Sequence, residues 1–240
     1  MIARLAARPD TDPTPIRHPA VLCLFAAAMG ILEAIVVVYL RRIYYPDGFG
    51  FPLTVMDAEV LRIEIIREAM TLMMLATVAW LAAGGAWPRL MAFVIAFGVW
   101  DILYYVGLKL FLDWPVSLVT PDILFLIPTV WVGPVLAPAL VAALWVVAGL
   151  LLHRHRYRDL GLGWKGWLAA CAGCGLILAS FLIHAGTHEA PGFLWGVYAA
   201  GYAIWVATLV VVLVNVRRST TSGPPRSTCR TSRGSLGWQA

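Results

Sequence analysis

Apolar residues along the chain are gathered in long runs that short polar segments separate. A helix needs about 20 apolar residues to cross about 30 Å of hydrocarbon. Six runs reach that length, and they cover residues 20–40, 58–83, 89–112, 122–152, 164–184 and 192–216. We interpret them as helices because a lone strand leaves its backbone hydrogen bonds unsatisfied in lipid. The pattern predicts an all-α fold class, a polytopic membrane bundle of six transmembrane helices.

The segments outside these runs differ in character from the runs themselves. Residues 1–19 contain four prolines, and residues 217–240 are rich in Ser, Thr and Arg without apolar periodicity. We therefore predict a disordered cytoplasmic N-terminus (1–19), a six-helix domain (20–216) and a disordered basic cytoplasmic tail (217–240). The first run ends at Arg41 and Arg42 with no small-residue cleavage site after it. We expect it to be a retained helix rather than a signal peptide.

Composition supports the membrane interpretation and excludes other classes. The 240 residues are 61% hydrophobic and 13% charged, with a mean hydropathy of +0.81, whereas soluble domains are about 25% charged. This excludes an ordinary soluble enzyme and a disordered protein. The four cysteines are not spaced as a disulfide framework. The chain also contains no nucleic-acid-binding motif, so we expect the lipid bilayer, and no nucleic acid, as a partner.

Basic residues are unevenly distributed between the two sides of the predicted membrane. With the N-terminus in the cytoplasm, thirteen of the eighteen Lys and Arg residues fall inside, and the strongest group is the basic stretch at 153–158. We therefore predict that the N- and C-termini are both cytoplasmic. Arg41 and Arg42 are the one adjacent pair of basic residues that this orientation places on the outer side.

Acidic residues show the opposite skew, because only Asp10, Asp12 and Asp159 fall on the inner side. The other ten lie on the outer side or in the outer half of the membrane. Acidic residues contribute little to topology. We therefore interpret the skew as an indication of function.

Four carboxylates lie within the predicted spans: Glu33, Glu64, Glu68 and Asp101. Leaving all four unpaired in lipid would cost about 10–14 kcal/mol, so we place them inside the bundle. Their distances from the span ends put all four at a similar depth in the outer half. We predict one ion, substrate or acid–base site, with Arg67 as countercharge and Tyr105 as a hydrogen-bonding neighbour. The alternative is that the start of the second helix is a solvated amphipathic segment.

The fourth run is interrupted by residues that disfavour a continuous helix. Five prolines occur between residues 115 and 138, and Gly133 stands beside one of them. We predict a break around Thr129–Gly133, with a short outer piece and a longer inner helix that begins near Pro134. Discontinuous helices are tolerated where they line a cavity. A kinked but continuous helix is the alternative.

A second candidate site is His184, His188 and Glu189 near the end of the fifth run. Two histidines four residues apart can bind one metal ion on a continuous helix. Gly186 and Pro191 indicate that the helix is ending, and this favours an interfacial loop instead. We predict no cofactor, with a divalent metal at these residues as the alternative.

The stretches Phe97–Tyr105, Trp114–Pro115, Asp122–Pro128 and Gly133–Pro138 resemble uncharacterised bacterial inner-membrane proteins over residues 20–140. This resemblance implies a bacterial inner (cytoplasmic) membrane protein and carries no activity. Pro121 and Asp122 are also similar to the acidic Pro-Glu-Glu motif of membrane carotenoid cyclases, but the second carboxylate is missing.

Three functions are compatible with these features. The first is a transporter or an ion- or proton-coupled carrier, which accounts for buried carboxylates beside a broken helix. The second is an intramembrane acid–base enzyme that acts on a lipid or isoprenoid substrate. The third is a metal-binding or accessory subunit of a membrane complex. The small ion or lipid-like substrate and the oligomeric state are not identified by the sequence.

Overall fold

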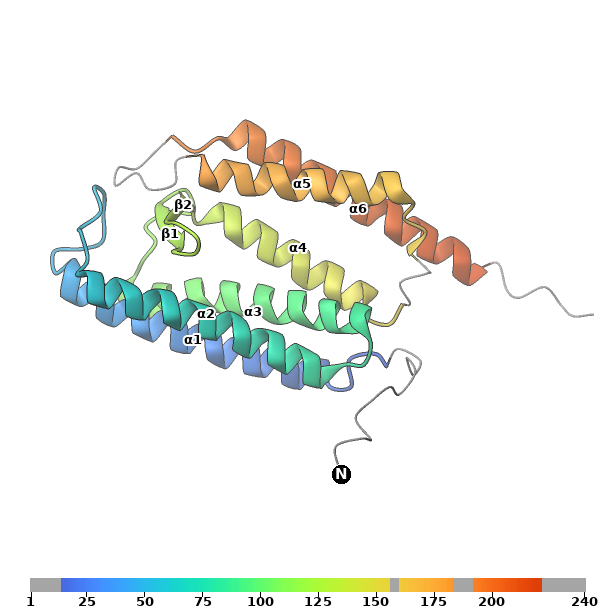
Figure 1. Ribbon diagram of the computed structural model, residues 1–240, viewed down its shortest axis with the longest axis horizontal. Coiled ribbons are helices and arrows are strands. Elements are labelled where there is room, and N and C mark those ends of the chain that lie inside the picture. The colour runs from blue at the N-terminus through green and yellow to red at the C-terminus, as the bar shows by residue number, and fades with distance from the viewer. Residues whose placement is uncertain (1–13, 156–159, 184–191, 222–240) are drawn as a thin grey trace, which may run out of the picture.

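The computed structural model describes residues 14–155, 160–183 and 192–221. This part of the chain forms six helices and one two-stranded sheet (Figure 1). The elements in chain order are α1 (Pro19–Tyr44), α2 (Ala58–Ala82), α3 (Ala86–Leu112), β1 (Pro121–Phe125), β2 (Trp131–Pro134), α4 (Leu136–Leu152), α5 (Trp164–Leu182) and α6 (Trp195–Thr221).

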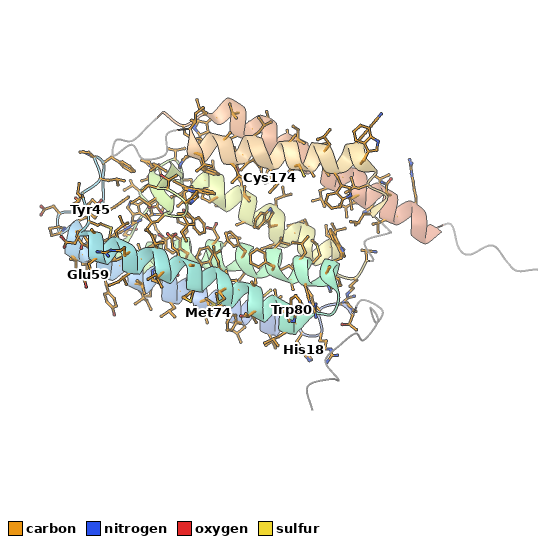
Figure 2. All side chains as sticks on the ribbon, viewed as in Figure 1. His18, Tyr45, Glu59, Met74, Trp80 and Cys174 are labelled. Atoms are coloured by element: carbon orange, nitrogen blue, oxygen red, sulfur yellow. The ribbon has the colours of Figure 1, made fainter. Side chains whose placement is uncertain are left out.

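The helices lie roughly along one long axis and alternate in direction (Figure 1). One end of the bundle carries the connection between α1 and α2, residues 45–57, together with the hairpin of β1 and β2. We call this end the hairpin end. The start of α1 and the end of α6 lie at the opposite end. Figure 2 correspondingly shows Tyr45 and Glu59 at the hairpin end, and His18 and Trp80 at the opposite end.

The structure supports the prediction that the chain is mostly helical and that its helices are compatible with a membrane. Within the described ranges, α1, α2, α3, α5 and α6 are long and apolar enough to cross a membrane. Many of their large apolar side chains are exposed, such as Leu81 on α2 and Leu110 on α3. Exposed apolar surface of this extent is typical of helices that face lipid. These helices suggest a multi-pass membrane protein. The apolar helix α4 is shorter, with 17 residues.

The fourth apolar run differs from the expected outer helical piece. Its first part is a β-hairpin, in which β1 pairs antiparallel with β2 in the register Pro121 to Pro134 and Asp122 to Gly133. Prolines at 121, 128 and 134 disfavour a helix here because they lack the backbone donor that a helix requires. The two strands satisfy each other's backbone groups instead. The inner helix begins at Leu136, close to the predicted start near Pro134.

Helices α1 and α3 pack closely, and this contact positions the site. A Cβ atom added to Gly30 of α1 would lie 2.4 Å from the carbonyl oxygen of Trp100 on α3. Only glycine fits there without moving the backbone of α3. Ala34, one turn further along α1, is fully buried. The small residues therefore hold Glu33 of α1 beside the segment of α3 that carries Asp101.

Helices α3 and α4 pack against each other, and α5 packs along α6. A Cβ atom added to Gly173 of α5 would lie 2.8 Å from the Trp205 ring and 3.0 Å from the Gly201 carbonyl oxygen of α6. The α5–α6 pair therefore uses small residues for close approach, as membrane helices commonly do.

The segments predicted to be disordered are described only in part. Residues 1–13 and 222–240 lie outside the described residues, so those predictions are untested there. Helix α6 continues to Thr221 and thus includes the first residues of the expected tail.

Candidate functional site

A partly open cavity of about 330 Å³ lies at the hairpin end, lined by residues of α1, α2, α3, the hairpin and the 45–57 segment. All six residues of the predicted site line it: Glu33, Glu64, Arg67, Glu68, Asp101 and Tyr105. Glu33 and Asp101 therefore do not point to opposite sides of the bundle. The structure brings the predicted residues together, while their roles in binding or catalysis remain predictions.

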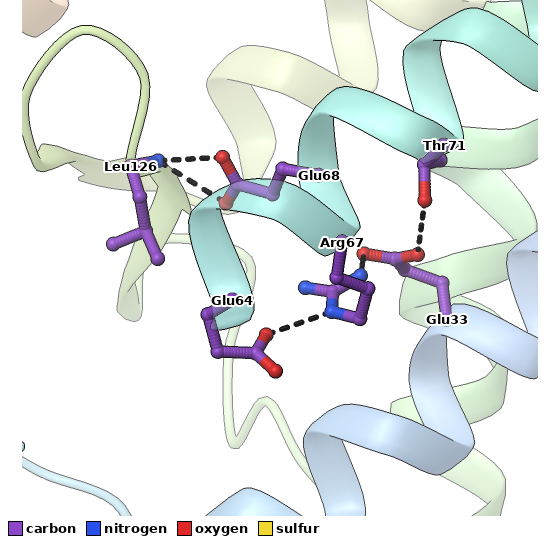
Figure 3. A network of polar contacts seen from close by, with 6 residues as sticks. All are labelled: Glu33, Glu64, Arg67, Glu68, Thr71 and Leu126. Atoms are coloured by element: carbon purple, nitrogen blue, oxygen red, sulfur yellow. Dashed lines mark hydrogen bonds and ion pairs between the residues drawn. The ribbon is translucent and has the colours of Figure 1, made fainter. Parts of the chain in front are cut away.

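Arg67 is the centre of the first polar network (Figure 3). Its Nη1 donates a hydrogen bond to Glu33 Oε1, and its Nε donates to Glu64 Oε2 at 2.7 Å. Thr71 Oγ1 donates a further hydrogen bond of 3.2 Å to Glu33 Oε2. One guanidinium group therefore pairs with two carboxylates from different helices. Arg67 is the countercharge that the sequence suggested, and it also joins α2 to α1.

Glu68 faces the hairpin rather than Arg67 (Figure 3). The backbone N–H of Leu126 donates to both carboxylate oxygens, at 3.1 Å to Oε1 and 3.0 Å to Oε2. Leu126 directly follows β1, where the chain leaves the strand and its backbone N–H is available for a side chain. The contact ties α2 to the hairpin across the cavity, and Glu68 is buried.

Arg41 and Asp122 form a second ion pair, which the sequence did not predict. Arg41 Nη2 lies 2.8 Å from Asp122 Oδ1, and the two side chains are 7% and 1% exposed. The guanidinium also lies over two aromatic rings, 4.2 Å from the centre of Phe49 and 3.8 Å from that of Trp114. The backbone N–H of Ile123 donates to the same Asp122 oxygen at 2.9 Å. The buried pair therefore anchors the end of α1 to β1.

The sequence held one indication of this pair. Arg41 belongs to the basic pair that disagrees with the orientation predicted from the sequence. A specific partner explains why such a residue is placed there. Its partner Asp122 is 81 residues away along the chain, so no local spacing could identify it.

Asp101 has the fewest hydrogen bonds and ion pairs of the cavity carboxylates among the described residues. The residue is 8% exposed, and its Oδ2 atom has no hydrogen-bond partner among the described residues. Tyr105 lies near both Asp101 and Asp122. Asp101 Oδ2 accepts no hydrogen bond from Tyr105 within the described residues, and the role of Tyr105 as a hydrogen-bonding neighbour stays a prediction. Asp101 is left with a buried acceptor atom whose hydrogen-bonding capacity is unsatisfied within the described residues.

The walls of the cavity combine charge with aromatic surface. Five carboxylates and two guanidinium groups line it, because Asp122 and Arg41 join the predicted residues. The aromatic lining, apart from Tyr105, comes from α1, α3 and the 45–57 segment, and it consists of Tyr44, Tyr45, Phe49, Trp100 and Tyr104. The arrangement provides an acidic interior with apolar walls. It is suited to bind a cation or to hold and release protons.

The second candidate site cannot be assessed in the same way. His184, His188 and Glu189 lie outside the described residues. Within the described ranges, no group of three or more His, Cys, Asp or Glu side chains is arranged to hold a metal ion.

Comparisons of the chain with protein-family models, with curated proteins and with solved structures give no match. The function is therefore inferred from the chemistry of the cavity and from the membrane-compatible helices around it.

Proposed function

We propose that the protein is a multi-pass carrier of the bacterial inner membrane that exchanges a small cation for protons. The observation that carries the proposal is the charge balance of the cavity, where five carboxylates face two guanidinium groups. Buried carboxylates without a countercharge are costly and in membrane proteins usually serve ion or proton movement.

The ion pairs divide the carboxylates into two groups with different roles. Arg67 engages Glu33 and Glu64, and Arg41 engages Asp122. Glu68 accepts hydrogen bonds from the Leu126 backbone, and Asp101, unlike Asp122, pairs with no arginine among the described residues. Glu68 and Asp101 are therefore the groups that take up a proton or a cation. One carboxylate neutralises one positive charge, so the two ligands compete, and this competition couples their movements.

The orientation follows from the charge distribution and from the direction of the helices. We place both ends of the chain in the cytoplasm, where most Lys and Arg residues then fall. The short helix α4, about 26 Å long at 1.5 Å per residue, crosses together with the hairpin as the sixth, interrupted span. This arrangement puts the cavity in the outer half of the membrane. Irregular backbone that lines a cavity is a recurrent feature of carriers.

A second candidate function is an acid–base enzyme that acts on a lipid or isoprenoid substrate. It is favoured by the aromatic lining, because Trp100 and Tyr104, which line the same cavity as Asp101, stack with ring centres 6.4 Å apart. Such a wall accommodates an apolar chain, and paired carboxylates supply acid and base.

Flux measurements on purified protein in liposomes test the carrier. An imposed potassium gradient should drive proton movement, which a trapped pH-sensitive dye reports. Glu68→Gln and Asp101→Asn should each lower this flux by about tenfold or more, which corresponds to about 1.4 kcal/mol. Glu59→Gln is the matched control, because Glu59 is exposed in the first turn of the same helix. It should leave the flux unchanged.

Size-exclusion profiles and melting temperatures of the variants show whether they fold. Folded variants that retain wild-type flux would exclude the proposed roles of Glu68 and Asp101. Absence of flux in the wild type, together with consumption of an added isoprenoid or lipid, would identify the enzyme instead.

A further inference from the structure

We propose that the cation bound in this cavity is a small organic ammonium ion, with its charge at Asp101 and its apolar groups against the aromatic face of α3. This inference rests on the proposed carrier function and specifies the substrate class of the same site. Three observations support it. They are the unpaired carboxylate of Asp101, the aromatic and apolar wall of the cavity, and the similar way in which the protein binds its own Arg41 guanidinium.

The first observation is the state of Asp101. Its side chain lines the cavity, the residue is 8% exposed, and Oδ2 is buried without a hydrogen-bond partner among the described residues. A buried carboxylate oxygen in this state is unfavourable unless a ligand completes it. A monovalent cation that enters the cavity supplies the missing positive charge.

The second observation is the surface next to this carboxylate. Trp100, Tyr104 and Tyr105 belong to the same stretch of α3, and all three line the cavity. The Trp100 and Tyr104 rings are stacked, and the Tyr104 and Tyr105 ring centres are 4.9 Å apart. Aromatic faces attract organic cations through their quadrupole and accept alkyl groups at the same time.

Much of the remaining wall is apolar, and its residues include Val37, Leu40, Leu53, Met56 and Leu61. Small inorganic cations such as Ca²⁺ and Mg²⁺ are held by oxygen ligands and gain nothing from apolar walls. A cation that carries alkyl or aryl groups gains from the same walls by burying its own apolar surface. The wall therefore favours an amphiphilic monocation.

Cavity size limits the ligand. A volume of about 330 Å³ lies at the lower end of the range of about 300–1,000 Å³ for small-molecule pockets. It suits an ammonium ion with one ring or a few short alkyl groups. A whole membrane lipid is too large to be enclosed.

The third observation is that the protein binds one of its own organic cations with the same set of groups. The Arg41 guanidinium is paired with the Asp122 carboxylate and lies over the rings of Phe49 and Trp114. Asp101 with Trp100 and Tyr104 repeats the combination of a buried carboxylate and aromatic rings. No side-chain cation pairs with Asp101 among the described residues. An external cation fits this position.

Competition binding to purified wild-type protein in nanodiscs tests the substrate class. Radiolabelled benzyltrimethylammonium is the probe. Unlabelled tetramethylammonium has the charge without the ring, benzyl alcohol has the ring without the charge, and benzoate reverses the charge. We expect unlabelled benzyltrimethylammonium to compete at least about tenfold more strongly than any of the three, because only it uses the carboxylate and the rings together. Selectivity measured on the wild type does not depend on whether any variant folds.

Two variants locate the site. Asp101→Asn should weaken binding of the probe by about tenfold or more, and Asp101→Glu, which retains the charge, should weaken it less. Tyr104→Leu should weaken binding by about two- to thirtyfold, the range expected for loss of a cation–π contact. The matched control is Tyr39→Leu, because Tyr39 is a 63% exposed tyrosine of α1 that does not line the cavity.

The outcomes separate this inference from the carrier function. Equal competition by benzyl alcohol, or wild-type affinity in folded Asp101→Asn, would overturn the substrate class. If the protein exchanges protons for potassium and benzyltrimethylammonium does not inhibit this exchange, the carrier function stands and the proposed substrate class is overturned. Selective binding of the probe without any coupled proton flux would support the substrate class while contradicting the carrier.

Discussion

At the scale of single residues, the two arginines of the cavity differ in what they do. Arg67 pairs with two carboxylates and retains partial exposure, with 22% of its side chain accessible. Arg41 is nearly inaccessible and is held by one carboxylate and two aromatic rings. The first arginine neutralises part of the site, whereas the second fixes the end of α1 to the hairpin. Their loss should therefore have different consequences.

Asp122→Asn should destabilise the protein by about 3–5 kcal/mol, because it leaves the Arg41 guanidinium buried without its partner. Thermal unfolding in detergent measures the change. The double variant Arg41→Leu with Asp122→Leu should be more stable than Asp122→Asn alone, since no unpaired charge remains buried.

The exposed pair of Lys109 and Asp113 provides the control, because their side chains are 53% and 92% accessible. Asp113→Asn should change stability little, since solvent screens an exposed ion pair. Equal effects of Asp113→Asn and Asp122→Asn would contradict the anchoring role of Arg41.

At the scale of elements, the site depends on how closely α1 approaches α3. Gly30 allows the helix backbone of α1 to meet the Trp100 carbonyl of α3. This approach places Glu33 and Asp101 around one cavity, which the hairpin and the 45–57 segment then complete. A wider separation of the two helices would enlarge the cavity and weaken the contacts of Arg67.

Gly30→Ala should destabilise the protein by about 1–3 kcal/mol, because its Cβ would overlap a backbone atom that cannot rotate away. Gly175→Ala is the matched control, since a Cβ at this helical glycine of α5 meets nothing within 4 Å. It should be neutral or stabilising by about 0.5–1 kcal/mol, because alanine favours a helix. An equal fall in the melting temperatures of the two variants would refute the close-packing explanation.

At the scale of the whole molecule, the distribution of charge sets the expected orientation. The net charge is +5, and thirteen of the eighteen Lys and Arg residues belong to segments that the sequence predicts to be cytoplasmic. The cavity with its carboxylates lies at the hairpin end. The start of α1 and the end of α6 lie together at the opposite end (Figure 1). A membrane protein with this distribution is expected to keep that end in the cytoplasm.

Reporter fusions test this orientation. Green fluorescent protein, which fluoresces only in the cytoplasm, should be active when fused after Gly85, after Asp159 and at the C-terminus. Alkaline phosphatase, which is active only outside, should be active when fused after Gly48 in the 45–57 segment. Phosphatase activity at Asp159 would exclude the proposed topology.

Local patterns in the sequence were sufficient to predict the helices and the inward carboxylates. The length of an apolar run is a local property, and it identified the regions of α1, α2, α3, α5 and α6 to within a few residues. The cost of charge in lipid indicated that Glu33 and Asp101 face the interior. The pairing of Arg67 with Glu64 also follows from local spacing, because residues three apart share a helix face.

Tertiary structure alone decided how these residues are connected. Arg67 reaches Glu33 from another helix, Glu68 accepts from the Leu126 backbone, and Arg41 meets Asp122 far away in sequence. The hairpin was missed for the same reason, since a strand is stabilised by a partner segment and not by its own residues. A run of apolar residues determines whether a segment can be buried. Which groups meet there depends on the packing of helices whose contacts are distant along the chain.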